Sequence, residues 1–338
     1  MQIHADPIPV EVTRGTLVES RHRVHAALVN GDGDIVAAWG DIEQHIYPRS
    51  SIKPLQALPL VESGAADAFD LSVAELALAC SSHQSEPMHT GTVSKWLARI
   101  GCSADDLECA GHLPRHDGAM LDLVRSRAPV TTIYNNCSGK HTGFLTTARH
   151  LGEPTKGYSS AAHPVQQRLA ALLSELGGAD LTDTERGIDG CGIPVIGMSL
   201  QALARAMGRM AAPETMDDKL GQAAKRIVEA MTTHPEMVRG TNGFDTLMMA
   251  AGKGRYATKT GAEGVHIAIV PRRRLGIAVK AEDGNTRASS VALGALLDDL
   301  GLVPDNARGK LRRVMAPTVT NAAGKPVGEI RVGPGWLD

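Results

Sequence analysis

The stretch from Val24 to Trp39 reads VHAALVNGDGDIVAAW, and its pattern predicts two paired strands. Small and aliphatic residues run from Val24 to Val29 and again over Ile35–Trp39, which is typical of strands whose alternate side chains face opposite ways. Between the two runs, Asn30-Gly31 predicts a hairpin turn with positive φ, because these residues tolerate that conformation best. An antiparallel sheet is therefore expected to begin near the N-terminus.

The hydrophobic pattern changes to a helical one from about residue 50 to about residue 250. Apolar residues recur there every three or four positions, so that each helix has one face to bury. Three such stripes are Val165, Leu169, Leu172 and Leu176; Leu200, Leu203, Met207 and Met210; and Leu220, Ala224, Ile227 and Met231.

Strands return at Val265–Val270 and Leu275–Val279, and the Arg272–Arg274 triplet between them is interpreted as a solvated turn rather than a nucleic-acid patch. A last helix is expected to start at Asn285 or Thr286, either of which can cap it. Strands at both ends and helices in the middle predict an α+β fold, with an antiparallel sheet built from about residues 8–45 and 255–335. We expect residues 1–338 to form a single unit.

Composition excludes several classes of protein. The 338 residues are 43% hydrophobic and 21% charged, with 35 basic and 37 acidic side chains giving a net charge of −2. Neither nucleic acid nor an anionic membrane is therefore favoured as a partner, and no apolar run is long enough to predict a membrane span. The five cysteines do not suggest a disulfide framework, and no leader-like segment opens the chain. A cytoplasmic location with reduced thiols is expected.

The segment Arg49-Ser50-Ser51-Ile52-Lys53-Pro54 places a lysine three residues after a serine at the start of a predicted helix. Ser50 and Lys53 then share a face, so the lysine amine can reach the serine hydroxyl and activate it as a nucleophile if the amine is neutral. Backbone N–H groups at the helix start could hold an oxyanion. The pair taken alone is equally readable as a capping serine beside a surface lysine.

A second motif, Lys259-Thr260-Gly261, follows about 200 residues later at the end of a predicted strand. Ser-x-x-Lys followed by Lys-Thr-Gly is the signature set of class A β-lactamases and penicillin-binding proteins. A third element is the cluster Cys80-Ser81-Ser82-His83, which follows an apolar helix from Val73 to Leu78. The Ser-Asp-Asn motif usual in the middle of those enzymes is absent from this region, which argues against penicillin chemistry.

Two cysteines stand in unusual surroundings. Cys137 lies at a predicted helix N-terminus, which favours a thiolate, and Cys191 lies between two glycines that leave its thiol unhindered. Each of them could also be a buried small hydrophobic residue. There is no paired Cys-x-x-Cys motif that would by itself predict zinc.

Taken together, these segments resemble the asparaginase II family, the class 3 or rhizobial-type L-asparaginases. The resemblance implies a serine β-lactamase-like or glutaminase-like fold, a homodimer, and hydrolysis of L-asparagine to aspartate and ammonia. It runs from about Leu17 to Pro271 through six blocks, which are Glu19–His22, Pro48–Lys53, Cys80–His83, Asn136–His141, Asp189–Pro194 and Lys259–Gly264.

The resemblance also implies roles for individual residues. The family's two Ser-Lys tandems fall on Ser50 with Lys53 and on Ser82 with Lys259. Its zinc site, made of two cysteines and a lysine with water, falls on Cys137, Lys140 and Cys191. The three residues expected beside this centre, contacting substrate, the zinc ligands or a bound water, are Arg49, His141 and Asp189. Cys80, Cys102 and Cys109 then remain as structural thiols.

The expected reaction is acyl transfer, in which Lys53 deprotonates Ser50, Ser50 attacks the side-chain amide, and Ser82 with Lys259 passes the proton to the leaving ammonia. The glycine-flanked Cys191 favours a zinc that anchors substrate, and a purely structural zinc is the alternative. Glutamine, a peptide amide or a β-lactam could replace asparagine as substrate. A non-catalytic amide or metal sensor is a further alternative, although four retained Ser and Lys residues argue against it.

Overall fold

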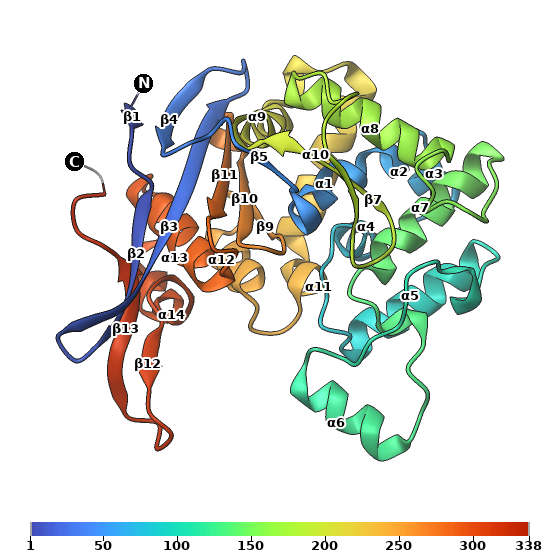
Figure 1. Ribbon diagram of the computed structural model, residues 1–338. Coiled ribbons are helices and arrows are strands. Elements are labelled where there is room, and N and C mark those ends of the chain that lie inside the picture. The colour runs from blue at the N-terminus through green and yellow to red at the C-terminus, as the bar shows by residue number, and fades with distance from the viewer. Residues whose placement is uncertain (1, 337–338) are drawn as a thin grey trace.

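The sheet of this protein is built from both ends of the chain. The computed structural model describes residues 2–336, and its main sheet has nine strands within that range (Figure 1). They are β1 (Gln2–His4), β2 (Ile8–Arg14), β3 (Leu17–Asn30), β4 (Ile35–Trp39), β9 (Ala257–Thr260), β10 (Val265–Val270), β11 (Leu275–Ala281), β12 (Thr318–Thr320) and β13 (Pro326–Val332).

Seven of these strands lie in the order β12-β13-β2-β3-β11-β10-β9, while β4 pairs with β3 and β1 pairs with β4. Every pairing is antiparallel except that of β1 with β4, which is parallel. The α+β class predicted from the sequence is confirmed by this topology, including the antiparallel sheet made of N- and C-terminal strands and the helical insert between them. That the whole chain forms one unit stays a prediction.

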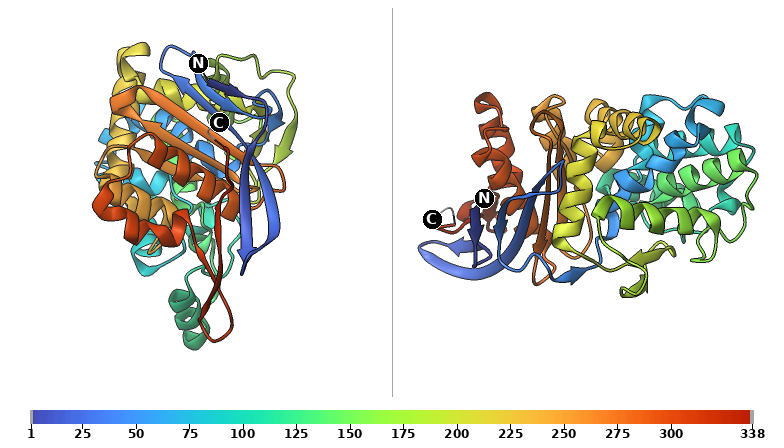
Figure 2. Two further views of the ribbon diagram at one scale, coloured as in Figure 1. Left: turned by 90° about the vertical axis from the view of Figure 1, so that its left-hand side faces the viewer. Right: turned by 90° about the horizontal axis from the view of Figure 1, so that it is seen from above.

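The second half of strand β3, from Val24 to Val29, is buried on both sides because the sheet there lies between two layers of helices. Val24, Ala26 and Leu28 belong to a core shared with α13 (Thr286–Asp299) and α14 (Asp305–Met315). Ala27 and Val29 belong instead to the core of the helical insert. Figure 2 shows α13 on one side of the sheet and the insert on the other. Both faces are buried, which explains the near-continuous hydrophobic run in β3.

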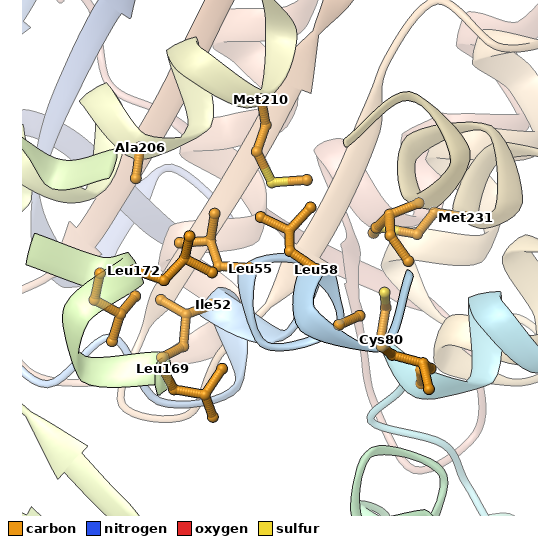
Figure 3. Close-up of a cluster of buried hydrophobic side chains, with 14 of the residues drawn as sticks. Ile52, Leu55, Leu58, Cys80, Leu169, Leu172, Ala206, Met210 and Met231 are labelled. Carbon is orange, nitrogen blue, oxygen red and sulfur yellow. The ribbon is translucent and has the colours of Figure 1, made fainter. Parts of the chain in front are cut away.

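The helical insert packs against the sheet through α9 (Leu200–Ala211). The three predicted stripes lie on α8, α9 and α10, and all twelve residues are buried. In Figure 3, Leu55 and Leu58 lie close to Leu172 and Met210. The other helices are α1 (Lys53–Gln56), α2 (Leu58–Glu62), α3 (Ala65–Ala68), α4 (Val73–Ala79), α5 (Pro87–Arg99), α6 (Asp117–Ser126), α7 (Ser138–Leu151), α8 (Pro164–Gly177), α10 (Asp218–Thr233), α11 (Pro235–Arg239) and α12 (Phe244–Gly252).

Two small sheets and several single turns complete the insert. Strand β5 (His45–Ile46) pairs with β8 (Met198–Ser199), and β6 (Arg186–Ile188) pairs with β7 (Pro194–Ile196). Short 3-10 helices cover Arg49–Ile52, Ala104–Asp106, Thr132–Tyr134, Pro213–Thr215 and Pro271–Arg273. Within residues 2–336, no helix is both long and apolar enough to cross a membrane.

The hairpin between β3 and β4 differs from the prediction in its turn. The positive φ belongs to Gly33, at +95°, and not to Asn30-Gly31. Asn30 instead acts through its side chain, whose oxygen accepts hydrogen bonds from the backbone N–H groups of Asp32 and Asp34. A four-residue loop, Gly31–Asp34, therefore replaces the expected two-residue turn, because an Asn side chain can organise a longer loop by itself.

Other local predictions are confirmed. Arg274 follows the 3-10 helix Pro271–Arg273 and pairs with Asp32 and Glu214 at the surface. Asn285 caps α13 by accepting a hydrogen bond from the backbone of Arg287. Helix α14 was not predicted from its sequence, since Leu311 is its one buried residue and a short, strongly polar helix gives only a weak hydrophobic signal.

Candidate active site

A cavity of about 420 Å³ lies where the edge strand β9 meets the helical insert. It brings together eight segments of the chain. Its lining includes the predicted residues Arg49, Ser50, Ser82, Cys137, Asp189 and Cys191, together with His112, Arg115, Asn136, Arg239 and Glu263. A larger hollow of about 910 Å³ lies between α12 and α14, but none of the predicted site residues lines it.

Ser82 lies between two buried lysine side chains. Its Oγ is 3.1 Å from Lys53 Nζ and 2.8 Å from Lys259 Nζ, and both lysines are 0% exposed. The loop that carries Ser82 follows α4. The backbone N–H of Ser82 donates a hydrogen bond to the carbonyl of Val238 at 2.9 Å. This serine is therefore held from the backbone as well as through its hydroxyl group.

Within the described residues, the hydrogen-bond partners of the Ser82 hydroxyl are these two amines. An ammonium group can only donate to Oγ, whereas a neutral amine can also accept the hydroxyl proton. Burial is the main cause that lowers the pKa of Lys259 to about 7; Asp245 acts in the opposite direction and nearby Lys53 acts with burial. Lys259 can thus accept the Ser82 proton while its own N–H donates to the carbonyl of Thr260 at 2.5 Å.

Lys53 opens α1 and reaches inward. Its Nζ donates to the carbonyl of Ser81, to Ser82 Oγ and to Cys137 Sγ, the last at 3.1 Å. Burial lowers the pKa of Lys53, while Cys137 acts in the opposite direction. The predicted contact between Lys53 and Ser50 is not formed in this structure, because the buried amine finds three acceptors on the other side.

Ser50 belongs to the 3-10 helix Arg49–Ile52 and is half-buried at the wall of the cavity. Within residues 2–336 its hydroxyl makes no hydrogen bond, so it is free to face a ligand. The preceding residue, Arg49, has a positive φ of +52°. Such a conformation is uncommon for a residue with a side chain and is often found at functional turns.

The end of β9 lies directly against the turn that carries Ser50. A Cβ atom on Gly261 would lie 2.9 Å from the carbonyl oxygen of Pro48 and 3.2 Å from the backbone nitrogen of Ser51, so only glycine fits without a shift. The N–H of Gly261 is used by the carbonyl of Val265. In the described residues, the N–H groups of Ser50 and Ala262 have no hydrogen-bond acceptor, so this junction offers two free donors.

The predicted metal ligands lie together beside this centre. Lys140 Nζ is 3.0 Å from Cys191 Sγ, and Cys191 and Cys137 interact through their thiols. The interaction with Cys191 lowers the pKa of Cys137, and the same interaction raises the pKa of Cys191. Burial acts to lower the pKa of Lys140, but the two sulfurs more than offset it and the net pKa is raised.

Two sulfurs and one nitrogen are donor types that zinc accepts. Among residues 2–336, no three His, Cys, Asp or Glu side chains are grouped so that they could hold a metal, so a metal here needs Lys140. The three side chains fit such an ion provided that Lys140 gives up its proton. Cys191 is only 4% exposed, although the flanking glycines predicted an open thiol.

The remaining predicted residues surround this group. Arg49 Nε donates to Asp189 Oδ1 at 2.7 Å, and Asp189 Oδ2 is 3.5 Å from Cys191 Sγ. His141 is fully buried on α7, where its Nδ1 lies 2.7 Å from the hydroxyl of Tyr158. The Nε2 atom of His141 is buried and has no hydrogen-bond partner within the described residues. His141 directly follows Lys140, so this unpaired atom belongs to the neighbour of a predicted metal ligand.

His83 has a structural role. It is 0% exposed, accepts a hydrogen bond from the backbone of Ser85 at 3.1 Å, and lies 2.9 Å from the hydroxyl of Ser138 at the start of α7. Its ring stacks on that of His89. Burial lowers the pKa of His83 well below its ordinary value, so the ring is neutral and fixes the Ser82 loop against α7.

A buried polar group behind Lys259 was missed by the sequence reasoning. Asp245, on α12, accepts hydrogen bonds from the backbone N–H of Thr260 at 3.0 Å and from its hydroxyl at 2.7 Å. His266 Nε2 lies 2.5 Å from the same hydroxyl and 3.5 Å from Asp245 Oδ1. Asp245, His266 and Lys259 are all 0% exposed. No short motif around Asp245 signals this arrangement.

The fold and site can be compared with known proteins. No curated protein matches the chain. Among solved structures, "Crystal Structure Analysis of Mglu in its native form" has 16% identity and a TM-score of 0.48, covering 87% of this chain and 69% of that chain. A putative β-lactamase from Bacteroides dorei has 14% identity and a TM-score of 0.44, covering 82% of this chain and 92% of that one.

A second β-lactamase, from Sphaerobacter thermophilus, has 16% identity and a TM-score of 0.43, covering 84% of this chain and 93% of that one. At the level of families, the model of L-asparaginase II matches residues 10–332, which is nearly the whole chain. That match extends beyond the six blocks on which the resemblance was first based. It includes every predicted site residue, and the chain therefore belongs to the L-asparaginase II family.

Proposed function

We propose that this amidohydrolase is an L-asparaginase, which converts L-asparagine to L-aspartate and ammonia through a serine ester. Membership of the L-asparaginase II family supports this substrate. The single observation that carries the chemistry is Ser82 Oγ, held at 3.1 Å and 2.8 Å between two buried lysine amines next to an accessible Ser50. A serine hydroxyl needs such a base to become reactive.

In this proposal, Ser50 is the nucleophile. Its Oγ bonds to the amide carbon while its proton passes to the neutral amine of Lys53, which must first turn toward Ser50 from its partners Ser82 Oγ and Cys137 Sγ. The oxyanion of the tetrahedral intermediate then receives hydrogen bonds from the N–H groups of Ser50 and Ala262, which have no other acceptor in the described residues.

The leaving group needs a proton. Lys53 gives the proton to Ser82, whose hydroxyl passes one to the amide nitrogen as the C–N bond breaks, and ammonia departs. Lys259, whose Nζ is hydrogen-bonded to Ser82 Oγ at 2.8 Å, can give a proton to the Ser82 hydroxyl group or accept one from it. Water then hydrolyses the aspartyl ester, and Ser50 regains its proton. Each step needs amines that change protonation near neutral pH, a property that burial gives to lysine.

Zinc is proposed as the cofactor, held by Cys137, Lys140 and Cys191. Thiolate and neutral amine are suitable ligands, and the ion when bound would supply positive charge at the cavity wall. Asp189 and His141 are proposed to steady this group from beside it, through the contact of Asp189 with Cys191 and through the unpaired Nε2 of His141. The sulfurs line the cavity, which favours substrate anchoring over a purely structural ion.

The test is ammonia release from L-asparagine by the purified protein and by Ser50→Ala. We expect Ser50→Ala to lower kcat by at least about a thousandfold, because the covalent pathway is lost. The matched control is Ser94→Ala on the exposed face of α5, which should leave kcat unchanged. Near-normal turnover by Ser50→Ala would show that another group is the nucleophile.

The same assay separates the alternatives. Faster release from L-glutamine than from L-asparagine would make the protein a glutaminase. Saturable binding of asparagine without aspartate formation would make it a sensor. We further propose a cytoplasmic location, which the five free thiols support. We also propose a homodimer, as the resemblance to the L-asparaginase II family implies. Light scattering after size-exclusion chromatography checks the dimer, and a monomeric mass would contradict it.

A further inference from the structure

We propose that Arg239 and Arg115 bind the α-carboxylate of the substrate, so that this cavity accepts free amino-acid amides and rejects amides that lack that group. Both guanidinium groups belong to residues that line the cavity around Ser82. The inference rests on the proposed function, because it names the substrate group that the same site would recognise.

Arg239 is the last residue of α11 and is placed beside the catalytic serine. Its Nη1 donates to the backbone carbonyl of Ser82 at 3.1 Å, and its side chain is half-buried at the cavity wall. A guanidinium has five N–H donors, and one of them is used here. The others have no hydrogen-bond partner in residues 2–336, although they stay accessible to the cavity.

Arg115 supplies a second cation on the same side. Its side chain is exposed, and neither Arg115 nor Arg239 forms an ion pair with any carboxylate among the residues that the structure describes. Burial lowers the pKa of Arg239, and the positive charge of Arg115 lowers it further against the attraction of Asp245. Two neighbouring cations that form no direct ion pair repel each other, and an anion between them would relieve that cost.

Gln84 fixes both arginine segments relative to Ser82. Its carbonyl accepts hydrogen bonds from the backbone N–H groups of Arg115 and His116, each at 3.2 Å. Its side-chain Nε2 donates to the carbonyls of Arg239 and Thr241. Because Gln84 lies two residues after Ser82, a single short loop sets the position of the serine and of both arginine backbones.

The course of the chain after α11 also suits this role. Gly240 has φ +87°, and Gly243 lies so close to Arg239 that an added Cβ would be 2.3 Å from its Cγ. Glycine at these positions lets the chain turn tightly around the arginine stem. The guanidinium is therefore held in advance of ligand binding, which reduces the entropy lost when a carboxylate arrives.

The other charged groups around the two arginines are already paired or are acidic, so Arg115 and Arg239 are the cations available to bind the α-carboxylate. Arg49 is paired with Asp189, and Asp245 is bonded to Thr260. Glu263 also lines the cavity and has no ion pair within residues 2–336, so it can receive an α-ammonium group. A cavity with two free cations and one free carboxylate matches a zwitterionic amino acid.

The test compares L-asparagine with two analogues that each lack one charged group and keep one amide. β-Alaninamide lacks the α-carboxylate, and succinamic acid lacks the α-ammonium. In Arg239→Met and in Arg115→Met, we expect kcat/KM for L-asparagine and for succinamic acid to fall by about 10- to 100-fold. For β-alaninamide the change should stay below about threefold, since it has no carboxylate to lose.

Arg125→Met is the matched control, because Arg125 is an exposed arginine on α6 away from the cavity. It should leave all three values unchanged. Arg239→Met could also displace Ser82, in which case all three substrates would lose activity together; Arg115→Met has no such contact with Ser82 and decides the matter. If Arg115→Met lost the same activity on all three substrates, Arg115 would not recognise the carboxylate and the proposal would be overturned. The carboxylate would then have to bind elsewhere in the cavity, for example beside Cys137 and Cys191.

If the wild-type protein releases ammonia from none of these amides, the proposed function fails by itself. The inference is then tested by calorimetry with L-aspartate and β-alanine, which differ only in the α-carboxylate. Tighter binding of L-aspartate that weakens about tenfold in Arg115→Met would support the carboxylate site. Binding of L-aspartate that is the same in both proteins would overturn it.

Discussion

Lys259 gives this site a pH dependence that can be worked out from a single residue. Burial lowers the pKa of its amine to about 7, so the neutral form predominates above that pH and the ammonium form below it. The proposed mechanism uses the neutral form. We therefore expect kcat/KM for L-asparagine to rise about tenfold between about pH 6 and about pH 8. A pH–rate profile checks this, and a rate that falls over the same interval would contradict it.

Asp245 should control where that rise occurs. Its buried carboxylate attracts a charged Lys259 and so opposes the lowering of the lysine pKa. In Asp245→Asn this attraction is lost, and the midpoint of the pH–rate profile should move to lower pH. Asp180→Asn, at a fully solvated position, is the control and should not move it. An unchanged midpoint in Asp245→Asn, with folded protein by circular dichroism, would show that Asp245 does not act on Lys259.

Ser50, Lys53 and Lys259 could be singled out because they lie in the short motifs Ser-x-x-Lys and Lys-Thr-Gly, whereas Ser82 was assigned only through the resemblance to the family. Asp245 and Arg239 could not, since one is an ordinary acidic residue in the first turn of α12 and the other an ordinary basic residue at the end of α11. Only the packing of these helices against β9 and the Ser82 loop gives them a role. The three-residue spacing of Ser50 and Lys53 did not predict that the Lys53 amine bonds to Ser82 instead of Ser50. Its partners depend on which acceptors surround the buried amine in the folded protein.

At the level of elements, the approach of β9 to the 3-10 helix Arg49–Ile52 is the contact that assembles the two serines and two lysines. Gly261→Ala would place a methyl group 2.9 Å from the carbonyl of Pro48 and force the two segments apart. We expect kcat to fall by about tenfold or more while the melting temperature changes little, since catalytic geometry is more sensitive than packing. Steady-state kinetics and calorimetry measure the two effects.

Gly309→Ala is the control for that substitution. Gly309 lies within α14, where an added Cβ meets no atom within 4 Å, so alanine should leave kcat unchanged and stabilise the helix by about 0.5–1 kcal/mol. If Gly261→Ala behaved like Gly309→Ala, the close approach of β9 would not matter for catalysis. The sequence predicted the strand and the motif, but the contact between them depends on how the whole sheet packs.

At the scale of the whole molecule, the proposed zinc would join α7 to the hairpin of β6 and β7, through Cys137 and Lys140 on one side and Cys191 on the other. Removing it should loosen two segments that are distant in sequence. We expect a chelator to raise KM for L-asparagine if the ion anchors substrate. A lower melting temperature with unchanged KM would support the structural alternative instead.

The same experiment includes a measurement of metal content for the wild-type protein and for Cys191→Ser. We expect Cys191→Ser to bind less metal. Cys102→Ser is the control, because Cys102 is a half-exposed thiol outside the cavity and should leave the bound metal unchanged. Equal metal content in Cys191→Ser and the wild type would contradict the ligand assignment.

The sheet that supports this site pairs strands that are far apart in the sequence, and this affects when the site can form during synthesis. Ile330 in β13 pairs with Val12 in β2, and Leu275 in β11 pairs with Asn30 in β3, so the first strands must wait for the last part of the chain. Pairings of such long sequence separation form slowly during folding. A chain emerging from the ribosome carries Lys53 and Ser82 long before Lys259. The proposed hydrolytic centre therefore cannot assemble on a nascent chain until β9, which carries Lys259, has been synthesised.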